Sequence, residues 1–264
     1  MNRTHRHRTA SQIIVASAVL ALAAGCAAPS QTTAPPASRS TSAEPAAEGC
    51  LRDDGGCLGV LAPGTYASEQ FTISGESSPG QLTYTVADGY WANALDHSPA
   101  YWFQPADPYA AGTGDDFLPG VYVWADIAGA LQEFPACPEE ADPSAPTDAA
   151  GLIAWISALP GVTTASLTEA AIGDLSVAGI ELELDPDTAP SCSWGPFVPL
   201  IAGRAGAEDA YMWGISGGER MHFYPLDLGG GHTAAVIIDA PAADFDALLP
   251  HAQQLIATLT FVTP

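Results

Sequence analysis

The strongest constraint on the fold is a hairpin pattern in the last third of the chain. Residues 220–227 and 232–239 have the composition of two strands, and they flank the turn Leu228-Gly-Gly-Gly231. A glycine-rich turn of this kind joins neighbouring antiparallel strands, because glycine tolerates the positive φ that tight turns require. The pattern therefore predicts an antiparallel sheet.

An amphipathic helix is predicted directly after this hairpin. Pro241 suits the start of a helix, and Asp244 places a negative charge near the positive N-terminal end. The apolar residues that follow fall on one stripe: Phe245, Leu248, Leu249, Ala252, Leu255 and Ile256. A second helix is expected after Asp148, a suitable N-cap, with the stripe Leu152, Trp155, Ile156 and Leu159.

Other segments alternate apolar and polar residues as strands do. Residues 82–86 form such a segment, and residues 101–103 are expected to be its hairpin partner. Further strands are expected at residues 121–124, 162–167, 175–184 and 210–215. Strands followed by a helix, twice over, predict an α+β domain in which helices cover an antiparallel sheet.

The first 26 residues predict export and a lipid anchor. Three arginines precede an apolar run of about 12 residues, shorter than the roughly 20 that a membrane-spanning helix needs. The run closes with Ala23-Ala24-Gly25-Cys26, which resembles a bacterial lipobox, although Ala23 stands where leucine is usual. We expect a signal peptide at residues 1–25 and a diacylated Cys26 on the extracytoplasmic face of the cell membrane. The alternative is ordinary cleavage nearby, which would leave Cys26 as a free thiol.

A tether and one domain are expected after the signal peptide. Residues 27–48 consist almost wholly of Ala, Pro, Ser and Thr, so they offer nothing large and apolar to bury. With Cys26 they make a lipid-anchored, disordered tether over residues 26–48. No second linker interrupts residues 49–264, which are expected to form a single extracytoplasmic domain.

Four cysteines remain if Cys26 carries lipid, and an even number in an exported chain favours disulfides over zinc. Cys50 and Cys57 enclose a short loop with an Asp-Gly turn, which favours local closure. Cys137 and Cys192 would then pair with each other. Four cysteines allow three pairings, and the sequence alone does not choose among them.

The charge of the chain excludes one class of partner. The sequence has 30 acidic residues against seven arginines and no lysine, a formal net charge of −23. Such a surface repels the phosphates of nucleic acids and of anionic lipids, so we expect membrane contact only through the lipid.

Two patterns in the chain resemble catalytic or metal sites, but neither has the context that its chemistry needs. Gly214-Ile-Ser216-Gly-Gly218 matches the nucleophile elbow of serine hydrolases, with Asp239, Asp244 or Asp246 and then His251 in suitable order. The elbow needs a helix directly after its serine, whereas a strand is expected here. The four histidines of the mature chain, His97, His222, His232 and His251, show no spacing for a shared metal. We expect no catalytic residues and no cofactor.

Carboxylates and aromatic rings are the remaining candidate ligand groups. Glu181, Glu183, Asp185 and Asp187 alternate with apolar residues, which suggests one acidic strand face, either solvated or binding calcium loosely. Six aromatic residues crowd a short stretch: Tyr90, Trp91, Tyr101, Trp102, Phe103 and Tyr109. Most of these are expected to pack in the core, but Trp91, Tyr101 and Trp102 are candidates for a ligand platform.

One family resemblance is visible. Leu61-Ala-Pro-Gly-Thr-Tyr66, Phe71 and residues 82–93 resemble segments of uncharacterised secreted lipoproteins of high-GC Gram-positive bacteria, and residues 220–261 are similar as well. In that group the second segment usually runs directly from its turn into Gly-Trp, whereas here Tyr90 precedes Trp91. The order of elements is similar to the PsbP/LpqN-like α/β/α sandwich. The resemblance implies a fold and a location, and it brings no catalytic motif.

These observations favour a lipid-anchored, non-catalytic binding or accessory module of the cell envelope. The alternatives are a secreted hydrolase that uses carboxylates and a structural spacer of the envelope. A cleft lined by convergent polar groups would favour binding or catalysis over a spacer.

Overall fold

The computed structural model describes residues 51–52, 57–73, 81–107, 119–185, 187–204 and 211–262, with only the backbone of residues 51, 52 and 57. All of these residues belong to one compact unit. Strand accounts for 50% of the structure and helix for 14%. No helix in these ranges is long and apolar enough to cross a membrane.

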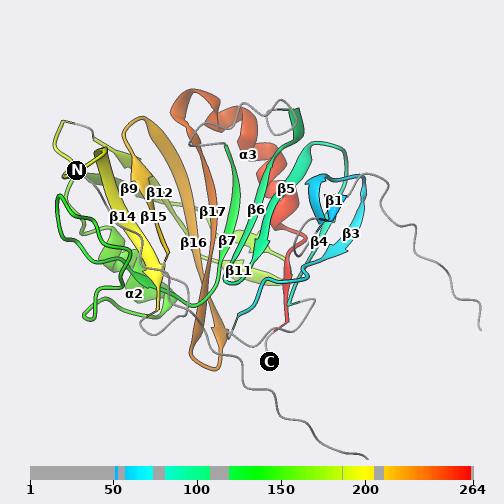
Figure 1. The fold of residues 1–264 in the computed structure, drawn as a ribbon, viewed down its shortest axis with the longest axis horizontal. Coiled ribbons are helices and arrows are strands. Elements are labelled where there is room, and N and C mark those ends of the chain that lie inside the picture. The colour runs from blue at the N-terminus through cyan, green and yellow to red at the C-terminus, as the bar shows by residue number, and fades with distance from the viewer. Residues whose placement is uncertain are drawn as a thin grey trace, which may run out of the picture. The chain divides into compact units, whose positions relative to one another are not determined.

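The centre of the fold is a nine-stranded antiparallel sheet (Figure 1). Its strands, in spatial order, are β1 (Leu51–Arg52), β2 (Cys57–Val60), β5 (Trp91–His97), β6 (Ala100–Pro105), β7 (Gly120–Trp124), β17 (His232–Pro241), β16 (Glu219–Gly229), β12 (Ile180–Leu184) and β9 (Val162–Ser166). The order departs from the chain order where β7 pairs with β17, which brings the C-terminal hairpin beside the N-terminal strands.

The predicted glycine hairpin is confirmed as β16 and β17. Gly229, Gly230 and Gly231 all have positive φ values, which only glycine adopts readily. Every residue of β17 from Thr233 to Ala240 is buried. Because successive side chains of a strand point to opposite faces, this run shows that both faces of the sheet are covered.

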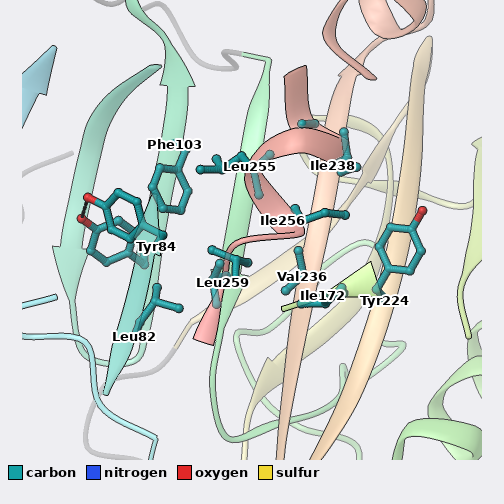
Figure 2. Close-up of a cluster of buried hydrophobic side chains, with 14 of the residues drawn as sticks. Leu82, Tyr84, Phe103, Ile172, Tyr224, Val236, Ile238, Leu255, Ile256 and Leu259 are labelled. Carbon is teal, nitrogen blue, oxygen red and sulfur yellow. Dashed lines mark hydrogen bonds between the residues drawn. The ribbon is translucent and has the colours of Figure 1, made fainter. Parts of the chain in front are cut away.

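One face of the sheet packs against α3 (Ala242–Ile256), which confirms the predicted C-terminal helix. The same core includes a small sheet of β3 (Gly64–Ala67), β4 (Leu82–Val86) and β18 (Thr260–Phe261), and the hairpin of β10 (Ala170–Ile172) and β11 (Leu175–Val177). Figure 2 shows the end of α3 in this core: Leu255, Ile256 and Leu259 lie between Tyr84 and Phe103 on one side and Val236 and Ile238 on the other.

The other face packs against the second predicted helix, α2 (Ala149–Ile156), and against further strands. The Asp148 side chain caps α2 by accepting a hydrogen bond from the Gly151 N–H at 2.8 Å. The further strands are β8 (Ile127–Gly129), β13 (Ser191–Cys192), β14 (Gly195–Gly203) and β15 (Met212–Ser216). The predicted disulfide Cys137–Cys192 is confirmed, and it joins β13 to the loop after β8. Cys50 and the side chain of Cys57 lie outside the described residues, so that predicted pair stays a prediction.

The predicted α+β class, a helix-covered sheet of the PsbP/LpqN-like α/β/α sandwich type, is wrong. The fold is β-rich, with 50% strand and 14% helix, and α2 and α3 share the covering of the central sheet with additional strands. The predicted pairing of residues 82–86 with 101–103 is also wrong. β4 pairs with β3 and β18, whereas β6 pairs with β5 and β7, so the two segments face each other from different sheets.

Candidate ligand-binding pocket

A pocket of about 360 Å³ opens at one end of the central sheet, beside the start of α3. It is lined by Gly89, Tyr90, Pro105, Ala106, Asp107, Pro119, Asp244, Ala247 and Leu248. Cavities that hold small ligands are usually about 300–1,000 Å³, so this one suits a small molecule.

The topology of the sheet explains why these distant segments meet. β5 begins where antiparallel β6 ends, since Trp91 pairs with Pro105, and the Ala106 N–H donates to the Tyr90 carbonyl at 2.7 Å. β7 begins at the same edge, and its Gly120 pairs with Asp239 near the end of β17. Since α3 follows β17 directly, its first turns close the pocket.

Close strand packing at this edge depends on Gly120. A Cβ at this position would lie 2.3 Å from the Phe103 carbonyl oxygen, a distance that no side chain tolerates. The absence of a side chain at Gly120 thus lets β6 and β7 approach each other closely at the strand ends beside the pocket residues Ala106 and Pro119.

Tyr90 supplies the aromatic part of the wall, and its ring is held from two sides. It stacks on the His251 ring of α3, with 3.7 Å between centroids and 3° between planes, and meets Trp91 edge to face. The Tyr90 N–H also donates to the Asp88 carboxylate at 3.0 Å, which shapes the turn before β5. Burial, followed by the charge of Asp88, raises the pKa of the Tyr90 phenol, so the ring is neutral at physiological pH.

Asp107 and Asp244 supply the charge of the pocket. Both side chains are exposed, and neither makes a hydrogen bond or ion pair with any described residue. Asp246, two residues further along α3, binds Arg220 at 2.9 Å instead. Asp244 lies in the first turn of α3, where the helix dipole favours a negative charge.

The candidate platform residues are not gathered on one surface. Trp91 and Tyr101 are buried on the α3 face, where the hydroxyl groups of Tyr101 and Tyr84 share a hydrogen bond of 2.6 Å. Trp102 points to the opposite face and packs against Tyr122, Trp124 and Trp213. Tyr90 is the aromatic residue of this stretch that lines the pocket, and Tyr109 lies outside the described residues.

The acidic strand face is shorter than the sequence pattern suggests. β12 ends at Leu184, and only Glu181 and Glu183 project from it on the same side. Asp185 lies in the following turn, where its carboxylate accepts hydrogen bonds from the Asp187 N–H at 3.0 Å and the Thr188 hydroxyl at 2.9 Å. No group of three or more histidine, cysteine or acidic residues suited to a metal ion occurs in the described ranges.

Glu181 belongs instead to a network that joins β12, β16 and α3. Its carboxylate accepts hydrogen bonds from Arg220 at 2.6 and 2.9 Å and from His222 at 2.9 Å, and Arg220 also reaches Asp246 of α3. Burial alone would raise the pKa of Glu181, but the contacts with Arg220 and His222 outweigh it and lower the pKa. Burial lowers the pKa of His222, against the opposing effect of Glu181. A neutral His222 with its proton on Nε2 can donate to Glu181 and accept from the Tyr224 hydroxyl at 3.3 Å.

The Gly-x-Ser-x-Gly pattern at Ser216 is followed by a strand, as expected from the sequence. Ser216 ends β15, and the next element is the strand β16 rather than a helix. The Ser216 N–H donates to Glu219 across this tight turn at 2.7 Å. Gly217 and Gly218 therefore form a tight turn that connects two different sheets, because β15 pairs with β14 whereas β16 pairs with β12 and β17.

The sequence pattern singles out Tyr90 and Asp244 separately, and it indicates no role for Asp107 and Pro119. In the sequence, these pocket residues stand out only as turn residues at the ends of strands. The pocket itself is assembled from four segments that are separate in the chain. Comparison of the chain with protein-family models, curated proteins and solved structures found no match.

Proposed function

We propose that this chain is a non-catalytic binding module of the cell envelope, which holds a small ligand in the pocket between Tyr90 and the first turns of α3. The observation that carries the proposal is a cavity of about 360 Å³ with an aromatic wall and two carboxylates that make no hydrogen bond or ion pair with any described residue. Apolar walls with a few placed polar groups are typical of ligand sites. A structural spacer would not need such a cavity.

The rigidity of the walls supports binding. Most of the pocket is built by the ends of packed strands and by a helix whose inner face is in the core. The Tyr90 ring is already held by His251 and Trp91, so little side-chain freedom would be lost when a ligand packs against it.

A ligand screen by NMR, with Tyr90→Ala as the test variant, examines this proposal. We expect a small ligand that binds the wild type to lose about tenfold or more in affinity in Tyr90→Ala, because the aromatic wall is removed. Trp194→Ala is the matched control, since Trp194 is an aromatic residue that is 61% exposed and does not line the pocket. Equal binding to wild type and Tyr90→Ala, or no binding by any ligand in the screen, would contradict the proposal.

The cellular location is part of the same proposal. The apolar run that ends at Gly25-Cys26 and the resemblance to secreted lipoproteins support a lipid anchor, with the domain held off the membrane by residues 27–48.

Fatty-acid labelling tests the anchor. We expect label on the wild type and none on Cys26→Ser, because the lipid is attached through the cysteine sulfur. Cys57→Ser is a control that keeps the lipobox and removes a different cysteine. Equal labelling of wild type and Cys26→Ser would exclude this anchor.

A further inference from the structure

The charged residues that line the pocket in the described part of the chain are both acidic. Asp107 and Asp244 are the charged residues of its wall, and Asp88 lies at the small neighbouring hollow that Trp91 and His251 line. Of the arginines with described side chains, Arg220 is bound to Glu181 and Asp246, and Arg204 donates to the Gly231 carbonyl at the far end of β17. Neither arginine neutralises the negative charge of the pocket.

The negative electrostatic potential of these carboxylates selects among ligands by their charge. A concave site with one sign of charge and low-dielectric walls focuses the potential and attracts ions of the opposite sign. The whole chain, with its net charge of −23, adds to the repulsion of anions. A neutral ligand could donate hydrogen bonds to the carboxylates of Asp107 and Asp244, but only a cation would also gain from Coulomb attraction.

The other wall residues favour an organic cation over a metal ion. Calcium takes six to eight oxygen ligands and magnesium demands near-ideal octahedral geometry. The pocket offers two carboxylates, one phenol and the apolar side chains Pro105, Ala106, Pro119, Ala247 and Leu248. Because the His251 ring covers one face of Tyr90, an ammonium or guanidinium group can meet this ring only at its remaining face or its edge, and the apolar walls accommodate the carbon substituents of such a ligand.

We infer that the pocket binds a small organic cation, with its positive group near Asp107 and Asp244 and its carbon substituents against Tyr90 and the neighbouring prolines. This inference rests on the proposed binding function and narrows it to one chemical class.

Choline and 3,3-dimethyl-1-butanol are suitable probes, because they have nearly the same shape and differ in the charge of the central atom. Titration of the full-length protein, followed by NMR signals of the Tyr90 ring, should show choline binding about tenfold tighter than the neutral alcohol. Added sodium chloride should weaken choline binding and leave the binding of the alcohol nearly unchanged.

The double variant Asp107→Asn/Asp244→Asn should bind both probes about equally. Asp174→Asn/Asp187→Asn is the matched control, since it removes the same charge from exposed positions outside the pocket and should keep the preference for choline. Circular dichroism spectra of both double variants should match that of the wild type.

Three results would overturn the inference. Equal affinity of the wild type for the two probes would leave the pocket a binding site for neutral ligands, so the proposed function would survive. Equal loss of preference in both double variants would assign the effect to overall charge. Calcium that displaces choline through Asp107 and Asp244 would make the pocket a metal site. A pocket that binds no probe and no ligand of the screen would contradict the proposed function itself.

Discussion

At the scale of single residues, Asp96 fixes a loop that no sequence pattern predicts. This β5 side chain is 5% exposed, and its carboxylate accepts hydrogen bonds from three consecutive backbone N–H groups, those of Glu69, Gln70 and Phe71, at 2.7, 3.1 and 2.9 Å. Burial raises the pKa of Asp96, and the three hydrogen bonds oppose this rise. Because the loop leads from β3, Asp96 links the small sheet to the central one.

Replacing Asp96 should therefore be costly. Asp96→Ala leaves three N–H groups without this acceptor, and we expect it to lower the free energy of unfolding by roughly 3 kcal/mol. Asp96→Asn keeps one acceptor oxygen and should lose less. Urea denaturation measures both effects, with the exposed Asp174→Ala as control. A loss within about 0.5 kcal/mol for Asp96→Ala, the usual range for surface substitutions, would contradict the assigned role.

At the scale of elements, the network around His222 fastens α3 to the sheet and makes this contact sensitive to pH. His222 is 5% exposed on β16, and its ring packs against Phe245 of α3 at 4.8 Å between centroids. It faces Glu181 from β12, and Arg220 and Tyr224 flank it on its own strand.

The direction of the pH effect follows from the lowered pKa of His222. In the unfolded chain the imidazole takes up a proton near its ordinary pKa of about 6.5, whereas in the folded protein it does so only at lower pH. The unfolded state therefore binds more protons in this window, and stability should fall as the pH drops below about 6.5. His222→Gln, which can still donate to Glu181, should lack this component.

Urea midpoints of wild type and His222→Gln, compared at each pH, measure the effect. The comparison is needed because burial raises the pKa values of Asp239 and Glu219, and these carboxyl groups change stability in the opposite sense on acidification. Parallel pH profiles for the two proteins would show that His222 does not contribute to the pH dependence.

The elements also show how far the sequence predicts the fold. The helices α2 and α3 and the hairpin of β16 and β17 were predicted correctly, because caps, turn glycines and apolar stripes are local signals. The pairing of β4 was not predicted correctly. The alternating pattern of residues 82–86 suits a strand that pairs with β6 as well as a strand that packs against β6 from another sheet. β14 was not predicted, because it contains Pro196 and Pro199, and proline is rare inside strands. Its pairing register with β15 shifts after Pro199. The pocket depends on these long-range pairings, so the sequence singles out Tyr90 and Asp244 but does not bring them together with Asp107 and Pro119.

At the scale of the whole molecule, negative charge dominates the surface. The sequence has 30 acidic and seven basic residues. Among the described residues, ion pairs form only at Arg220, His222 and His232. Most carboxylates therefore face water without a cation, and their mutual repulsion opposes the compact state.

Screening of this repulsion should stabilise the domain, and calcium should add nothing beyond screening. About 0.1 M salt shortens the reach of surface charges to about 10 Å, and a gain of 1 kcal/mol would raise the Tm of a domain of this size by about 2–4 °C. The sequence pattern allowed loose calcium binding at Glu181, Glu183, Asp185 and Asp187. In the structure Glu181 accepts hydrogen bonds from Arg220 and His222, Glu183 lies 4.0 Å from Arg220, and the Asp185 carboxylate accepts hydrogen bonds within the turn after β12. We therefore expect equal Tm shifts in sodium chloride and calcium chloride at the same ionic strength. A larger shift in calcium that Glu183→Gln reduces would show that this strand face holds the ion despite its arginine.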